Sequence, residues 1–126
     1  MSRRDDLIAL RDAVQAGKAF RLDDPQRKAR TAEYPCLGGY YEDNMAYGAF
    51  HGSVDAALVF LTAVLPGWKL QALQQFESGT WYSKIYKPMT DWPKWTPFPE
   101  AEASAETPAR ALLLATLNAL IAEADT

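Results

Sequence analysis

The side chains most often used in catalysis and metal binding are scarce in this chain. It has one histidine, His51, and one cysteine, Cys36, so the strong nitrogen and sulfur ligands of a tetrahedral zinc site cannot be assembled within it. Cys36 and His51 could act as a nucleophile and its base, but no catalytic motif surrounds either residue. The sequence also contains no phosphate-binding loop, dinucleotide fingerprint or serine elbow. It therefore predicts no catalytic residue, no metal site and no cofactor.

Two pairs of adjacent acidic residues are the remaining candidates for chemistry. Asp23-Asp24 and Glu42-Asp43 could each hold a hard cation or act as acid and base. Adjacent side chains on an extended segment point to opposite sides, however, so neither pair converges on one site. We interpret both pairs as solvated.

Aromatic residues are concentrated in a segment that favours neither a helix nor a central strand. In residues 90–100, Trp92, Trp95 and Phe98 recur every three residues among prolines at positions 93, 97 and 99. Such prolines favour polyproline II, whose three-residue turn would place these rings on one side of an extended rod. That side either packs along a sheet edge or is offered to a partner. We expect Trp95 inside and Trp92 toward solvent, because a three-residue period drifts relative to a twisted strand edge.

A predicted β-hairpin supplies a second candidate surface. Residues 68–76 and 81–87 have the composition of strands, and Ser78-Gly79 predicts a two-residue turn that pairs Glu77 with Thr80. The face toward the helices would then carry Trp68, Leu70, Ala72, Phe76, Trp81 and Ile85. The reverse face would carry Lys69, Gln71, Leu73, Gln75, Tyr82, Lys84 and Tyr86. It is too aromatic for plain solvation, so Tyr82, Lys84 and Tyr86 are candidate binding residues.

Three helices are predicted, over about residues 3–16, 54–65 and 108–124. Ser2 and Ser53 are placed to cap the first two, and Thr107-Pro108 opens the third. Only Asp55 and Thr62 interrupt the apolar surface of the second helix. We therefore expect that helix to be buried except for a thin polar stripe.

Arg110 has an unusual place in the third helix. It lies on the apolar stripe near the helix N-terminus, where a cation is electrostatically disfavoured. Its side chain either extends to solvent or meets a ligand beside the free backbone N–H groups. Arg110 is thus a further candidate binding residue.

Residues 18–52 and 88–106 are predicted to be irregular. Prolines and glycines interrupt the first segment, in which a short strand near Gly39 to Tyr41 is expected. Tyr40 and Tyr41 are candidate binding residues, since long loops in small domains are often functional; alternatively, their rings pin the loop to the core. Residues 1–126 together are predicted to form one domain.

Composition and charge restrict the partners. Thirteen basic and sixteen acidic residues give a net charge of −3, which provides no general attraction for nucleic acid. A single cysteine excludes an internal disulfide, and the start MSRRDDLIAL lacks the apolar centre of a signal peptide. The longest strongly apolar run, AALVFL, is too short to span a bilayer. We expect a cytoplasmic protein with no membrane partner.

Several motifs in the C-terminal part of the chain are similar to those of a known family. SVDAAL at residues 53–58, LPGW at 65–68, Trp81, and TPA at 107–109 before a leucine-rich helix together resemble the phage ABA sandwich domain, a family of small phage and prophage proteins. The resemblance implies an α+β protein with α-β-α layering, a small antiparallel sheet with helices on both faces, the first helix partly covering the reverse face of the hairpin. It also implies a viral protein that works in the cytoplasm of a bacterial host. It implies no activity and no catalytic residue.

Three functions remain open from the sequence. The leading hypothesis is a non-enzymatic phage accessory protein that binds a host protein, such as a component of a defence system, and inhibits or adapts it through surplus aromatic residues. The second is a binder of a nucleotide-like small molecule, with tyrosine or tryptophan stacking on a base, Arg110 and Lys84 meeting phosphate, and a homo-oligomer forming the pocket. The third is an unrecognised enzyme that uses residues 34–51.

Overall fold

The fold, seen in a computed structural model, is described here for residues 2–21, 32–89 and 98–124. Its elements, in chain order, are α1 (Arg3–Gln15), the 3-10 helix η1 (Pro35–Leu37), α3 (Tyr40–Phe50), α4 (Val54–Val64), β1 (Lys69–Gln75), β2 (Trp81–Tyr86), β3 (Glu100–Ala105) and α5 (Pro108–Ala124). The strands form an antiparallel sheet in the order β1-β2-β3. This architecture confirms the predicted α+β class and the predicted antiparallel hairpin.

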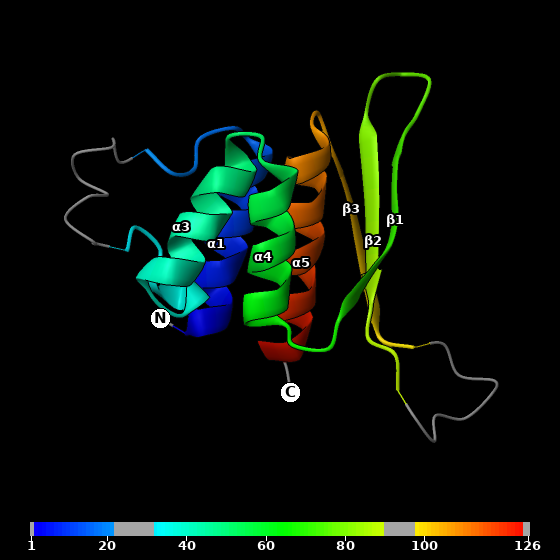
Figure 1. The fold of residues 1–126 in the computed structure, drawn as a ribbon. Helices are drawn as coiled ribbons and strands as arrows, with labels where there is room; N and C mark the ends of the chain where they lie inside the picture. The colour runs from blue at the N-terminus through cyan, green and yellow to red at the C-terminus, as the bar shows by residue number, and fades with distance from the viewer. Residues whose placement is uncertain (1, 22–31, 90–97, 125–126) are drawn as a thin grey trace.

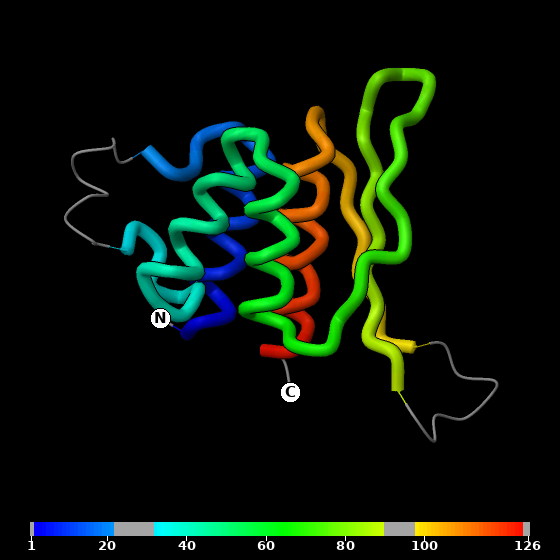
Figure 2. Tube along the Cα trace, viewed as in Figure 1, coloured from blue at the N-terminus to red at the C-terminus, as the bar shows by residue number. Residues whose placement is uncertain are grey.

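The helices gather on one face of the sheet (Figure 1). α5 lies directly on the sheet, and α1, α3 and α4 pack against α5 from the other side (Figure 2). α5 can serve both layers because it is buried around almost its whole circumference, including Leu112, Leu114 and Leu117. The layering thus differs from the helix-sheet-helix order that the family resemblance implied. α1 contacts α5 and η1 and leaves the reverse face of the hairpin uncovered.

The predicted helix starts are confirmed by their capping hydrogen bonds. The Ser2 hydroxyl accepts from the Asp5 backbone N–H at 3.2 Å, and the Ser53 hydroxyl accepts from that of Ala56 at 3.0 Å. These local bonds satisfy backbone donors that have no partner within the helix. Among the described residues, no helix has both the length and the apolar character needed to cross a membrane.

The helix α3 corrects the prediction of an irregular segment with a short strand near Gly39 to Tyr41. The sequence argument treated Gly48 as an interruption, yet Gly48 lies inside α3. A Cβ atom at this position would lie 2.9 Å from the Ala56 Cβ of α4. The glycine is therefore a point of close approach between two helices.

We expect Gly48→Ala to lower the free energy of unfolding by about 1 kcal/mol. Alanine favours a helix over glycine by about 1 kcal/mol, but overpacking a tight contact costs about 1 to 3 kcal/mol, and the short Ala56 side chain cannot swing away. Urea denaturation measures the change. In an Ala56→Gly background the clash is removed, so the same substitution should become stabilising; stabilisation in both backgrounds would contradict the packing explanation.

The hairpin register differs by one residue from the prediction. Gln75 pairs with Trp81 and Leu73 with Ser83, and the Phe76 N–H donates to the Thr80 carbonyl at 2.8 Å. The loop is therefore a three-residue one that ends at Gly79, whose φ of +92° suits a glycine bulge. The predicted two-residue turn at Ser78-Gly79 is wrong.

This register moves residues of β1 between the two faces. A bulge between Leu70 and Ala72 adds a second shift, so Leu70 and Leu73 both pair with inward residues of β2, whereas Phe76 shares the outer face with Tyr82. The prediction that Ala72 and Phe76 face the helices, and that Leu73 and Gln75 face away, is therefore wrong. The inward face of the sheet carries Leu70, Leu73, Gln75, Trp81, Ser83, Ile85, Ala101, Ala103 and Ala105.

The strand β3 corrects the second predicted irregular segment, residues 88–106. Its sequence, EAEASA, alternates exposed residues with half-buried alanines that pack against the core under α5. Such alternation is the period of a strand with one covered face. Alanine is small and a poor strand former, so its composition did not indicate a strand, and the prediction of an irregular segment here is wrong.

The α4 surface corrects a third expectation. Ala57, Phe60 and Leu61 are buried, but Leu58 and Val59 are 37% and 38% exposed. The outward side of α4 is thus apolar as well as polar, and the predicted thin polar stripe of Asp55 and Thr62 is wrong.

Candidate binding surface on the open face of the sheet

The face of the sheet that points away from α5 is open among the described residues (Figure 1). β2 presents Tyr82, Lys84 and Tyr86 on this face, because its inward residues Ser83 and Ile85 are fully buried and side chains alternate along a strand. The three predicted candidates therefore lie together, as expected. We call this surface the open face.

Two polar contacts join β2 to β3 across the open face. The Tyr82 hydroxyl donates to the Glu102 carboxylate at 2.5 Å, and the Lys84 ammonium lies 3.1 Å from the Glu100 carboxylate. The hydrogen bond to Glu102 raises the pKa of Tyr82 to about 12. Tyr82 therefore remains a neutral phenol, and the contacts hold both side chains of β2 in place.

Aromatic rings occupy both ends of the open face. Near the hairpin loop, the Phe76 and Tyr82 ring centroids are 5.8 Å apart with the planes inclined by 34°. At the other end, the Tyr86 and Phe98 centroids are 6.2 Å apart with an inclination of 31°. Phe76 is 45% exposed and Phe98 39% exposed. A shallow depression of about 450 Å³ beside Tyr86 is lined by Leu70, Gln71, Tyr86, Phe98 and Glu100.

The chemistry of this surface suits recognition. Half-exposed rings provide apolar contact area at little cost in side-chain entropy, and their fixed neighbours keep them ordered before a partner arrives. Lys84, Glu100 and Glu102 provide charged groups between the rings. The charged groups of the open face are engaged in two separate pairs, Tyr82 with Glu102 and Lys84 with Glu100.

Arg110 has a structural role that explains its placement at the start of α5. One guanidinium nitrogen, Nη2, donates to the Phe50 carbonyl at 3.1 Å, and the guanidinium carbon lies 4.2 Å from the centroid of the Phe50 ring. Phe50 is the last residue of α3, where free carbonyls and the helix dipole favour a cation. Arg110 thus stabilises the C-terminal end of α3.

Arg110 and Lys84 are not brought together. Lys84 lies on the open face, whereas Arg110 belongs to α5 on the covered side of the sheet. A polar hollow of about 370 Å³ beside Arg110 is lined by residues of α1, α5 and the end of β3. The two cations that the nucleotide hypothesis assigned to one phosphate group therefore lie on opposite sides of the sheet.

Tyr40 and Tyr41 belong to α3, which is separated from the open face by α5 (Figure 1). Tyr41 is 55% exposed and lines a groove of about 410 Å³ with Leu58, Val59 and Thr62 of α4 and their neighbour Ala63. Tyr40 is half-buried. These two tyrosines therefore form no common site with Tyr82 and Tyr86.

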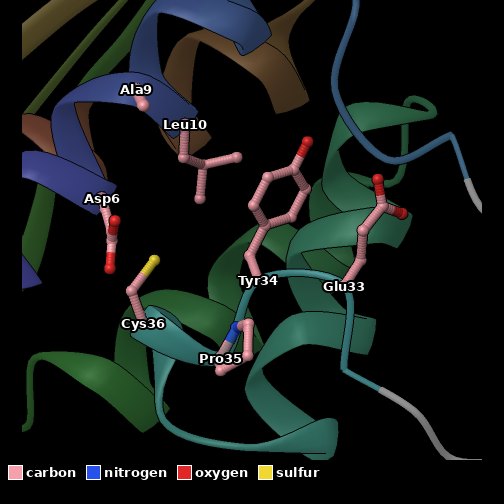
Figure 3. Close-up of a pocket in the computed structure, with 7 residues that line it drawn as sticks. All are labelled: Asp6, Ala9, Leu10, Glu33, Tyr34, Pro35 and Cys36. Atoms are coloured by element: carbon pink, nitrogen blue, oxygen red, sulfur yellow. The ribbon is translucent and has the colours of Figure 1, made fainter. Parts of the chain in front are cut away.

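The Cys36 thiol lines a pocket of about 360 Å³ between α1 and η1 (Figure 3). Its sulfur faces Asp6 and Leu10, and Glu33 lies on the far side of the Tyr34 ring. Burial raises the pKa of the Cys36 thiol, and the Asp6 carboxylate raises it further. Reactive cysteines instead have a lowered pKa, so this thiol has the properties of a structural residue.

Cys36 and His51 do not form a nucleophile and base. Cys36 precedes α3 and His51 follows it, so an eleven-residue helix of roughly 16 Å separates them. The His51 ring instead packs against Tyr47 at 4.5 Å and Phe50 at 5.2 Å between centroids. Within residues 2–21, 32–89 and 98–124 no three histidine, cysteine, aspartate or glutamate side chains are grouped in a way that could hold a metal ion.

An aromatic cluster centred on Phe20 joins the two described ends of the connection between α1 and α3, residues 16–21 and 32–39. The Phe20 ring lies 4.9 Å from Tyr34, 6.3 Å from Tyr47 and 5.7 Å from Phe50, all between centroids. Its φ of +54° is unusual for a bulky residue and is held by this packing. Phe20 and Tyr34 therefore attach these two described ends to the core.

Asp43 is fully buried and accepts the Tyr34 N–H at 2.7 Å, so the interpretation of Glu42-Asp43 as a solvated pair is wrong. The other acidic pair, Asp23-Asp24, lies outside the described residues.

Sequence reasoning missed three members of the open face. Phe76 is predicted on the opposite face, and Glu100 and Glu102 fall in the segment predicted to be irregular. The alternation of glutamate with alanine in residues 100–105 was the signal for a strand with an outward acidic row. The predicted binding residues Trp92 and Trp95, and their assignment to solvent and interior, lie outside the described residues.

Comparisons of the chain with protein-family models, curated proteins and solved structures give no match.

Proposed function

We propose that this chain is a non-enzymatic accessory protein of a bacterial virus, which binds a host protein through the open face and inhibits or adapts it. A component of a bacterial defence system is the proposed class of partner. The viral origin rests on the sequence motifs described above. The binding surface rests on one observation: a sheet face without a helix over it among the described residues carries exposed Phe76 and Phe98 beside Tyr82 and Tyr86.

A protein partner fits the open face better than a small molecule does. Small ligands prefer concave sites that bury most of their surface, and the depression beside Tyr86 is shallow and lies at one end of the face. The aromatic pairs are instead spread over the length of β2, which suits a wide and nearly flat contact. Tyrosine is among the residues that contribute most to the affinity of such interfaces.

Tyr82→Ala and Tyr86→Ala are expected to weaken partner binding by about 2 kcal/mol each, or roughly 30-fold. Both side chains are half-buried on a strand that keeps its pairing, so the fold should remain intact. The partner is first captured from bacterial lysate on the immobilised wild-type chain and identified by mass spectrometry. The purified partner is then titrated with each variant by calorimetry.

Leu58→Ala provides the matched control. Leu58 is an exposed apolar residue on α4, far from the open face, and its loss should leave the affinity unchanged. Equal affinity for the wild type and both tyrosine variants would overturn the assignment of the surface. A greater loss with Leu58→Ala would move the binding site to the groove between α3 and α4.

A further inference from the structure

The pairing of the three strands arranges the residues of the open face in rows across the sheet. From the open end of the hairpin toward its loop, the rows are Lys69, Tyr86 and Glu100; then Ala72, Lys84 and Glu102; then Gln74, Tyr82 and Ser104. Side chains of one row lie opposite one another, and the next row on the same face follows two residues later on β2 and β3. The open face therefore has two distinct ends, one at Lys69 and one at Tyr82.

These two ends differ in charge. The Lys69 ammonium is exposed and makes no ion pair with a described residue, and the Lys84 ammonium leans toward the same end, where it meets Glu100 at 3.1 Å. The Glu102 carboxylate leans the other way, toward Tyr82, whose hydroxyl is a neutral donor. No cation among the described residues forms an ion pair with Glu102. One end of the open face therefore carries an unpaired cation and the other an unpaired anion.

Glu102 is held through both its main chain and its side chain. Asn118 of α5 donates an amide hydrogen to its carbonyl at 3.0 Å, and Tyr82 donates to one carboxylate oxygen, Oε2, at 2.5 Å. The other carboxylate oxygen, Oε1, has no hydrogen-bond partner among the described residues. Glu102 is exposed, and the Tyr82 ring beside it lies 5.8 Å from the exposed Phe76 ring. An ordered carboxylate with a free acceptor thus lies next to an accessible aromatic pair.

Arginine is the side chain whose chemistry matches this arrangement. Its guanidinium is planar, carries five N–H donors and stacks on aromatic rings, so it can lie on the Tyr82 ring while it donates to the Glu102 carboxylate. A lysine ammonium would make the hydrogen bond without the stacking. At the other end, the Lys69 ammonium suits a carboxylate. A partner with both charges has one favourable orientation on the open face, because the reverse orientation brings like charges together.

We infer that the host segment bound by the open face carries an arginine, which lies on Tyr82 and donates to Glu102, and an acidic side chain, which pairs with Lys69. This inference rests on the proposed function, since it assigns the chemistry of the partner at the same surface. The aromatic residues supply contact area, and the two charges determine the orientation of the partner.

The first test uses the isotope-labelled full chain and a probe that carries arginine alone. N-acetylarginine amide is titrated while the backbone amide signals are followed by NMR, and N-acetylcitrulline amide is the neutral control of similar shape. The arginine probe should shift the Tyr82 and Glu102 signals in a saturable way, and the citrulline probe should not. Glu102→Gln should abolish the shifts, because it removes the charge while its amide oxygen still accepts from Tyr82.

Glu106→Gln is the matched control for this titration, since Glu106 is exposed beside Arg110, away from the open face. It should respond to the arginine probe as the wild type does. The inference would be overturned by the absence of a shift with the arginine probe, by equal shifts with both probes, or by wild-type shifts in Glu102→Gln.

The second test uses the partner captured by the wild-type chain. Glu102→Gln should raise its dissociation constant by roughly tenfold and Lys69→Gln by about threefold, whereas Glu106→Gln and Lys18→Gln should leave it unchanged. High salt should weaken binding of the wild type more than that of Glu102→Gln. If the two tyrosine variants weaken binding and the two open-face charge variants do not, the proposed function stands and this inference fails. If none of the four variants weakens binding, both fail.

Discussion

Phe60→Ala is expected to lower the free energy of unfolding by about 3 to 5 kcal/mol, the largest loss among the substitutions considered. Phe60 is fully buried on the side of α4 that joins the common core. Truncation removes most of a large apolar side chain and leaves a cavity that a tightly packed helix layer cannot close. Such a loss is a large part of the stability of a domain of this size, about 5 to 15 kcal/mol. Urea denaturation followed by circular dichroism measures it.

Leu58→Ala is the matched control on the same helix. Leu58 is 37% exposed and lies on the outward side of α4, so its truncation should cost less than about 1 kcal/mol. Similar losses at the two positions would show that α4 is covered on both sides in solution. That outcome would favour the burial pattern expected from the sequence over the one in the structure.

Arg110→Ala is expected to cost about 2 to 4 kcal/mol. It removes a charge-assisted hydrogen bond to the carbonyl of Phe50, worth about 1.5 to 3 kcal/mol, and a cation–π contact with its ring, worth about 0.5 to 2 kcal/mol. It also leaves the C-terminal end of α3 without its cation. The measurement is again the free energy of unfolding in urea.

Two further variants identify the cause of that loss. Arg110→Lys keeps the charge but not the planar guanidinium, so it should recover only part of the stability. Arg11→Ala removes a partly exposed arginine that pairs with exposed Asp12, and it should change stability by less than about 0.5 kcal/mol. If Arg110→Ala were as stable as the wild type, the structural role of this residue would be disproved and its role as a ligand-binding group would return.

The parts of the fold that depend on local chemistry could be predicted from the sequence. Ser2 and Ser53 cap their helices through residues three positions later, and these signals need no knowledge of the rest of the chain. α3 could not be found in this way. Gly48 looks like a helix breaker until Ala56 of the next helix is known to lie against it.

The candidate site, too, could be predicted only where it depends on local sequence. Tyr82, Lys84 and Tyr86 lie on one strand with a period of two, so an error in the pairing of β1 could not separate them. The face on which Phe76 lies depends on the length of the hairpin loop. The loop has one residue more than predicted, and this places Phe76 on the other side of the sheet. The place of Glu102 on the open face could be predicted only if the alanine-rich segment 100–105 had been recognised as a strand.

The Asn118 side chain of α5 donates to the Glu102 carbonyl at 3.0 Å, and this bond at the edge of β3 has a consequence for polymerisation. A sheet with two reactive edges is equivalent to a bifunctional monomer, which can add further units at both ends and grow without limit. The Asn118 amide occupies the Glu102 carbonyl, so this edge of the sheet is partly closed to an added strand. Closing one edge removes one of the two points of growth that a fibre needs.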